Sequence, residues 1–211
     1  MTIDQAFPPY PLNEKFLLEG ISYLTKIDPD LSKIVADLGF PPLWSREPGF
    51  PTLIHIILEQ QVSLASARAA FVKLKGSVGQ LTPESFLGLT DGELRRIGFS
   101  RQKTLYCRQL SNAILNGELN LEGLRDLGDS SVRAELMKIK GIGPWTADIY
   151  LLMALLSPDI WPSGDLALAK VVQDIKRLSS TPSPDLLLEI AEKWKPWRAV
   201  AARILWHYYL S

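Results

Sequence analysis

The chain has 211 residues, 23 basic and 23 acidic side chains and therefore a formal net charge of zero, and 46% of its residues are hydrophobic. This length and composition suit one large domain or two small lobes with an apolar core. The single cysteine, Cys107, excludes an intramolecular disulfide, a four-cysteine zinc site and an iron–sulfur cluster held by four thiolates. Neutrality argues against a protein that coats nucleic acid through bulk charge, although a local patch can still bind it.

The N-terminal residues 1–9 lack the basic start and apolar run of a signal peptide, and no apolar run approaches membrane-spanning length, so we expect no membrane association. Apolar residues recur with helical periodicity almost throughout, and no useful strand-like alternation occurs, which predicts an all-α fold. Thr82 and Thr90 each precede an acidic first turn and predict helix starts. Further helices are expected over 16–24, 31–38, 53–58 and 64–74, the last capped by Ser63.

The stretch 136–147, Leu-Met-Lys-Ile-Lys-Gly-Ile-Gly-Pro-Trp-Thr-Ala, predicts two helices that meet at a hairpin. Gly141 and Gly143 can take positive φ at low cost, and Pro144 suits the first position of a helix that continues through Leu156. The backbone N–H groups at this helix start lack intrahelical partners and, with the helix dipole, form an anion site suited to a phosphate. A Gly-x-Gly before a helix also fits a plain tight turn.

Asp165 follows the loop from Pro162 to Gly164 and precedes an apolar helix, so we place it at or near a helix N-cap. The field of the helix start favours a negative charge there. Asp165 alone could be only a cap. Asp148, one turn into the second helix of the hairpin, is a competing carboxylate that we expect to complement the helix dipole instead.

Together, the hairpin and the Pro-x-Gly-Asp segment that ends at Asp165 resemble the helix-hairpin-helix plus Gly/Pro…Asp signature of the DNA glycosylase superfamily. The details resemble its 3-methyladenine DNA glycosylase II branch, and the similarity runs from about Pro42 to Leu210. The resemblance implies a two-lobed helical fold with the active-site cleft between the lobes. One lobe would comprise about 1–45 and 165–211, and a central lobe of about 50–160 would carry the hairpin.

The chain departs from the larger bacterial member of the branch, because residues 1–45 are too few and too helical for its extra N-terminal sheet domain. Within the resemblance, Asp165 is the catalytic carboxylate that stabilises a positively charged sugar and guides water to it. Trp145 and Trp206 match pocket tryptophans that face the flipped base. We assign Trp194 and Trp197 to packing.

The segment Gln60 to Ser63 matches the family's loop that enters the minor groove beside the lesion. Gln61 is the candidate to fill the gap left by the extruded base, with Val62 as the alternative, although the two amides could simply cap their helix. The segment from Leu94 to Lys103 faintly repeats the hairpin and is either a second DNA-contacting hairpin or a generic turn. The expected DNA contacts are Gln60, Gln61, Ser63, Ser100, Arg101, Lys103, Lys138, Lys140, Gly141, Gly143 and Thr146.

The resemblance implies hydrolysis of the N-glycosidic bond of alkylated purines such as 3-methyladenine and 7-methylguanine in double-stranded DNA, by base flipping, as a step of base excision repair. Bifunctional family members place a lysine nucleophile where this chain has Trp145, so we expect an abasic product without strand cleavage. Two alternatives stay open. The scaffold could act on uracil, mismatched thymine or an oxidised base, or the chain could be a non-catalytic hairpin protein that binds the DNA backbone.

We expect a monomer that requires no cofactor and has no iron–sulfur cluster. The family's hairpin implies a structural Na⁺ or K⁺ held by the backbone carbonyls of Met137, Ile139 and Ile142. DNA as the substrate places the protein in the cytoplasm with the bacterial nucleoid, or in the nucleus of a eukaryote.

Overall fold

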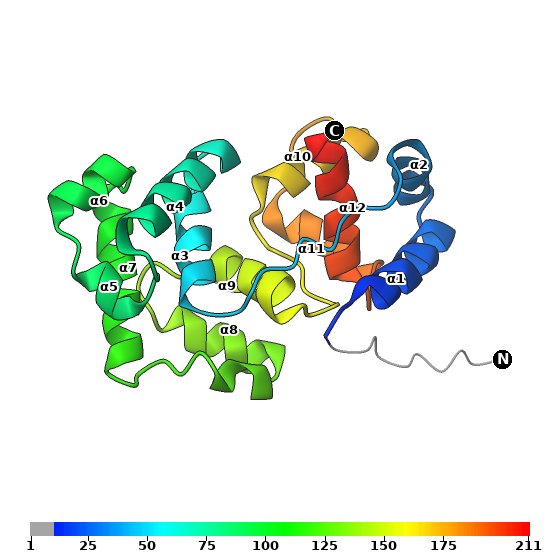
Figure 1. The fold of residues 1–211 in the computed structure, drawn as a ribbon. Coiled ribbons are helices and arrows are strands. Elements are labelled where there is room, and N and C mark those ends of the chain that lie inside the picture. The colour runs from blue at the N-terminus through cyan, green and yellow to red at the C-terminus, as the bar shows by residue number, and fades with distance from the viewer. Residues whose placement is uncertain (1–10) are drawn as a thin grey trace. The chain divides into compact units, whose positions relative to one another are not determined.

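The computed structural model describes residues 11–211, and all regular elements in this range are helices, which confirms the predicted all-α fold (Figure 1). None of the described helices is both long enough and apolar enough to cross a bilayer. The chain divides into two compact units. Unit 1 takes the described residues up to Ser45 together with Leu156–Ser211, and unit 2 is Arg46–Leu155. The expectations for the first ten residues lie outside the described part of the chain.

Unit 2 is organised around α3 (Phe50–Glu59), which packs against α4, α7 and α9. Its apolar residues lie on all sides of the helix, so it can be stable only when it is surrounded by other elements. Its fully buried side chains are Leu53, Ile54, Ile56, Ile57 and Leu58. The other elements of the unit are α4 (Leu64–Val78), α5 (Pro83–Leu87), α6 (Asp91–Ile97), α7 (Arg101–Leu115), the 3₁₀ turn η1 (Gly123–Asp126), α8 (Asp129–Met137), α9 (Pro144–Tyr150) and the π-helical turn η2 (Leu151–Leu155).

Local sequence sets the helix starts of unit 2. Thr82 begins α5 and Thr90 begins α6, and each forms a capping box with the residue three positions later, Ser85 and Glu93 respectively. In a capping box the two side chains satisfy two backbone N–H groups that the helix itself leaves without partners. Ser63 caps α4 in the same region of the chain. All three predicted helix starts are confirmed.

Unit 1 is organised around the C-terminal helix α12 (Arg198–Leu210), which packs against α1, α2 and α10. Small residues on α12 and α1 allow the helices to approach closely: a Cβ added at Gly20 would lie 2.8 Å from the Trp197 ring. The buried residues of α12 include Ala199, Val200, Ala201, Ala202, Ile204 and Leu205. The other helices are α1 (Glu14–Ile27), α2 (Pro29–Leu38), α10 (Leu166–Ile175) and α11 (Pro184–Glu192).

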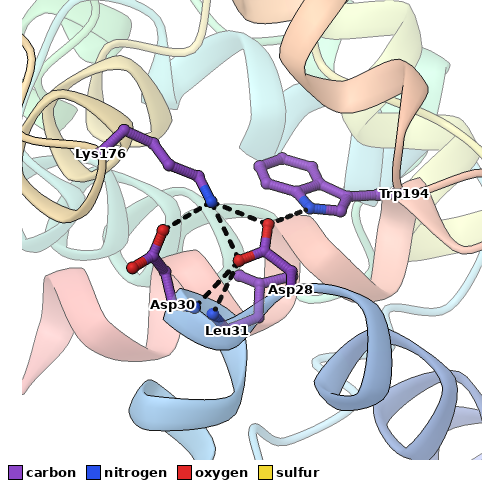
Figure 2. A network of polar contacts seen from close by, with 5 residues as sticks. All are labelled: Asp28, Asp30, Leu31, Lys176 and Trp194. Atoms are coloured by element: carbon purple, nitrogen blue, oxygen red, sulfur yellow. Dashed lines mark hydrogen bonds and ion pairs between the residues drawn. The ribbon is translucent and has the colours of Figure 1, made fainter.

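A polar network joins the two separate stretches of chain that make up unit 1 (Figure 2). Asp28 caps α2 and accepts hydrogen bonds from Lys176 Nζ at 2.8 and 2.9 Å and from the Trp194 indole N–H at 2.8 Å. Lys176 also donates to Asp30 at 2.6 Å. Charge-assisted hydrogen bonds of this kind are stronger than neutral ones. The network therefore fastens the turn between α1 and α2 to residues near the ends of α10 and α11.

Asp28 and Lys176 titrate away from their ordinary values because of this network. Burial alone would raise the pKa of Asp28, but the hydrogen bonds from Lys176 and Trp194 and the ammonium charge outweigh it, so the pKa is lowered below 3.8. Burial alone would lower the pKa of Lys176, but hydrogen bonds to Asp28 and Asp30 raise it. A carboxyl whose pKa is lower in the folded state stabilises the fold above its unfolded-state pKa and loses that contribution as pH falls.

We predict that Asp28→Asn lowers the free energy of unfolding by about 2 kcal/mol at pH 7, because two charge-assisted hydrogen bonds weaken in a largely buried setting. The difference from wild type should shrink below about pH 4, as the wild-type carboxyl itself becomes protonated. Urea unfolding at pH 7 and at pH 3 measures both. Asp30→Asn, at a more exposed carboxylate, is the control and should cost less; an Asp28→Asn effect that is the same at both pH values would contradict the assignment.

Candidate functional site

In unit 1, Asp165 lies at the N-cap of α10, as predicted, and is 8% exposed. Its Oδ1 accepts the Leu168 backbone N–H at 2.9 Å. The indole N–H of Trp206, which is also 8% exposed, donates to the same oxygen at 3.4 Å. The structure therefore brings together two of the predicted site residues, one carboxylate and one tryptophan, that are 41 positions apart in sequence.

These contacts fix the orientation of the Asp165 carboxylate before any substrate arrives. The start of α10 favours a negative charge, because its first N–H groups and the helix dipole point toward the carboxylate. A buried, oriented carboxylate can stabilise a positive charge that develops in a reaction, since no solvent has to reorganise around it. The arrangement suits a reaction that passes through a cation.

In unit 2, the predicted hairpin lies between the end of α8 at Met137 and the start of α9 at Pro144. Gly141 has φ of +97°, and a Cβ there would lie 2.1 Å from Cγ of Tyr106. Gly143 differs from the expectation of positive φ: it is extended, with φ of −93°, and its Cβ position is open. Gly141 is thus required by backbone conformation and by packing, whereas Gly143 keeps side-chain bulk away from the start of α9.

The second helix of the hairpin is not regular over its expected length. The α-helix ends at Tyr150 and continues as the wider turn η2 to Leu155, and Leu156 has a positive φ of 59°. Within this helix Asp148 is fully buried and forms an ion pair with Arg133 of α8. The competing carboxylate therefore links α8 to α9.

The side chain of Gln60 is bound to the hairpin. Its Nε2 donates to the Gly141 carbonyl at 2.9 Å and to the Thr146 hydroxyl at 2.8 Å. Thr146 is only 2% exposed. The structure therefore gives Gln60 and Thr146 side chains a role in holding the hairpin against the end of α3, and a contact of either residue with DNA stays a prediction.

The loop after α3 presents exposed side chains. Gln61 is exposed and left-handed, with φ of 55°, and Val62 is 46% exposed. Both candidates for the gap-filling residue are thus accessible, and the choice between them stays a prediction. Ser63, the next predicted contact, uses its hydroxyl to cap α4 by accepting the Ser66 N–H at 3.2 Å.

The turn between α6 and α7 is a helix–Gly–helix turn in which Ser100 caps α7 and Arg101 is exposed. Lys103 is half-buried, and its Nζ donates to the Leu58 carbonyl at 2.6 Å. Burial lowers the pKa of Lys103 below its ordinary value. Because Lys103 supports the C-terminal end of α3, its expected contact with a phosphate stays a prediction, as do those of Ser100 and Arg101.

The other predicted residues of the hairpin take no part in the hydrogen bonds of Gln60. Lys140 is exposed, and Lys138 pairs with Glu135 at 2.7 Å. Trp145 is half-buried at the start of α9. Trp194 and Trp197 are buried in unit 1, as expected of packing residues.

The carbonyls proposed to hold a monovalent cation fit that role in part. The Ile139 carbonyl already accepts the Ile142 N–H at 3.0 Å, which leaves it one further lone pair. Residues 11–211 contain no group of three or more His, Cys, Asp or Glu side chains placed to hold a metal ion. The residues that the resemblance implies for a cation at the hairpin are Met137, Ile139 and Ile142, through their backbone oxygens.

Two features next to the predicted site residues have no signal in the sequence. Tyr106 packs over Gly141, a contact with no local signal because 35 residues of chain separate the partners. Leu166, directly after Asp165, is 83% exposed, which its apolar side chain does not indicate.

Comparison with known proteins identifies the class. Residues 54–196 match the model of the HhH-GPD superfamily base excision DNA repair proteins, so the chain belongs to this superfamily.

Individual relatives carry more specific names. A Schizosaccharomyces pombe relative, DNA-3-methyladenine glycosylase 1, is 29% identical over 87% of this chain and 84% of its own length. The solved structure of the S. pombe 3-methyladenine DNA glycosylase in complex with abasic DNA has a TM-score of 0.85, is 28% identical, and covers 89% of this chain and 95% of that one. The Bacillus subtilis DNA-3-methyladenine glycosylase is 29% identical over 80% of this chain. This chain spans 64% and 58% of the lengths of two B. subtilis relatives.

We predict that Gly141→Ala lowers the free energy of unfolding by about 2 kcal/mol or more, because alanine is strained at positive φ and its Cβ collides with Tyr106. Gly143→Ala should cost less than about 1 kcal/mol, since its backbone is extended and the space in front of it is open. Thermal or urea unfolding of the two variants tests the contrast. Equal stability losses would show that the hairpin does not depend on the Gly141–Tyr106 approach.

Proposed function

We propose that the protein is a monofunctional DNA glycosylase that removes alkylated purines, 3-methyladenine and 7-methylguanine among them, from double-stranded DNA and leaves an abasic site. The observation that carries the proposal is the buried Asp165 carboxylate, held at the start of α10 by the Leu168 N–H and the Trp206 indole. The names of the relatives from S. pombe and B. subtilis support the substrate class.

The chemistry follows from these groups. The sugar carbon of a stacked nucleotide is inaccessible, so the lesion must leave the duplex before its N-glycosidic bond can be cut. Alkylation of a purine ring nitrogen gives a cationic base, which stacks favourably on an electron-rich indole such as Trp206 and departs more readily than a normal base. As the bond breaks, positive charge develops on the sugar, and Asp165 stabilises that charge and guides the attacking water.

In this proposal the hairpin attracts the phosphate backbone of the DNA. The uncapped start of α9 and the exposed Lys140 favour a DNA phosphate, and such contacts position the duplex without reading its sequence. Because the attacking group is water and a carboxylate stabilises the cation, the reaction needs no cofactor. A Na⁺ or K⁺ at the carbonyls of Met137, Ile139 and Ile142 would reinforce the phosphate attraction. We further propose a monomer located with the chromosomal DNA, in the nucleoid-containing cytoplasm or the nucleus.

We predict that Asp165→Asn decreases base release by at least about a hundredfold while DNA binding persists, because the substitution removes the charge and keeps the shape. The assay is release of free 3-methyladenine and 7-methylguanine from methylated duplex DNA, resolved by chromatography, with DNA binding measured in parallel. Asp185→Asn, at an exposed acid in the first turn of α11, is the matched control and should be as active as wild type.

Two results would redirect the proposal. If wild type binds DNA and releases no alkylated purine, a panel of duplexes with single uracil, mismatched thymine or oxidised bases decides whether another lesion is the substrate. If Asp165→Asn binds as well as wild type and neither protein releases any base from that panel, the chain is a DNA-binding protein without glycosylase activity.

We also predict that the protein has no lyase activity, because the hairpin carries Trp145 at the position that bifunctional members of the superfamily give to lysine. Incubation with lesion-containing duplex should give abasic DNA that breaks only after alkali. Borohydride should trap no covalent protein–DNA adduct. A trapped adduct, or strand breaks without alkali, would show that another amine forms a Schiff base with the sugar.

A further inference from the structure

The first residue of α10 is unusually exposed for an apolar side chain. Leu166 is 83% exposed, whereas the next most exposed large hydrophobic residues of the described chain, Phe40 and Val72, are 62% and 61% exposed. A single exposed leucine needs no explanation on an arbitrary surface. Leu166, however, directly follows Asp165, whose carboxylate is buried and oriented. Leu166 is therefore an exposed apolar residue directly beside the candidate catalytic carboxylate.

A cation lies on the same side of α10. Residues four apart on a helix are neighbours, so Lys170 follows Leu166 along one exposed face. The opposite face is buried through Leu168, Ala169 and Val172. Within residues 11–211 no carboxylate forms an ion pair with Lys170. The first turn of α10 also carries no acidic residue. This face is thus apolar at its start and positively charged one turn later.

The residue on the other side of Asp165 is also exposed. Gly164 is exposed, has φ of +82°, and has no atom within 4 Å of the position where a Cβ would lie. A backbone without a side chain allows close approach of another molecule. We call Gly164, Leu166 and Lys170 together the α10 face. Asp165 lies between its first two members.

We propose that the α10 face is a contact surface for the sugar–phosphate strand that carries the lesion, with Leu166 packed on a deoxyribose and Lys170 bound to a phosphate. The inference rests on the proposed function, because a strand whose sugar reaches Asp165 must also pass its neighbours Gly164 and Leu166. Deoxyribose offers C–H groups to an apolar side chain, and a phosphate offers charge to an ammonium group.

The spacing within the α10 face agrees with this assignment. A rise of about 1.5 Å per residue separates Leu166 and Lys170 by about 6 Å along the helix. One strand of a duplex advances about 3.4 Å per nucleotide, so the two side chains are slightly less than two nucleotide steps apart and can contact nucleotides one or two positions from each other. The contacts position the strand and carry no sequence information. Leu166 and Lys170 are accordingly positioning residues for the reaction at Asp165.

The first test concerns Leu166. Leu166→Ser should weaken binding to a duplex with one stable abasic-site analogue about tenfold and lower kcat/KM for base release by a similar factor, whereas Leu166→Met should stay close to wild type. The melting temperature should not change, because the side chain is exposed. Phe40→Ser, at the most comparable exposed apolar residue of unit 1, is the control and should leave affinity unchanged.

The second test concerns Lys170. Each phosphate contact contributes about 0.9 to the slope of log K against log salt concentration. Lys170→Gln should therefore reduce the slope for the same abasic-analogue duplex by about one. Lys193→Gln, which removes another exposed lysine of unit 1, should leave the slope unchanged.

The two tests separate failure of the inference from failure of the proposed function. The proposed strand contact of the α10 face would be overturned, even with normal base release, by two results together. These are wild-type affinity for Leu166→Ser and equal salt slopes for Lys170→Gln and Lys193→Gln. If wild type releases no base, the proposed function fails. The binding measurements still test whether the α10 face contacts DNA, because they require no catalysis. A Leu166→Ser variant that loses melting temperature along with affinity would show a structural role and also overturn the assignment.

Discussion

The hairpin of unit 2 depends on the two hydrogen bonds that the Gln60 amide donates to the Gly141 carbonyl and the Thr146 hydroxyl. They join the end of α3 to residues 81 and 86 positions later in the chain. On its other side, the peptide between Gly141 and Ile142 donates its N–H to the Ile139 carbonyl. Because this peptide is held at both ends, the turn cannot rotate independently of α3. The geometry of the hairpin is therefore set by a residue outside it.

In unit 1 the Asp165 carboxylate is likewise held by a residue distant in the sequence, Trp206. The Asp165 carboxylate lies at the start of α10, where it accepts a backbone N–H and an indole N–H. These interactions orient the carboxylate in the free protein, so under the proposed function no further ordering of this group is needed during the reaction. The exposed residues on both sides of Asp165 contrast with its own burial. An oriented, buried carboxylate thus lies between two exposed residues.

The sequence predicts best what local chemistry decides. Thr82, Thr90 and Asp165 are found at helix starts because capping depends on residues within one turn. The distinction between Gly141 and Gly143 was beyond the sequence, since it depends on where Tyr106 packs. The hydrogen bonds of Gln60 and Lys103 to distant carbonyls have no signal in the sequence for the same reason, because a polar side chain beside a turn looks the same whether it faces solvent or a distant carbonyl. Residue types pointed to the site, but partners distant in the chain decide how each residue is used.

The division of unit 1 between both ends of the chain has a consequence for synthesis on the ribosome. Asp28 and Trp194, which share a hydrogen bond, are 166 positions apart, and all of unit 2 is made between them. All of unit 2 has been synthesised once Leu155 has emerged, whereas α1 and α2 lack their packing partner until α12 is made. Helix α12, which is translated after all of unit 2, thus completes the part of unit 1 that was made before unit 2. A truncation that removes α12 removes the core of unit 1 while leaving that of unit 2 whole.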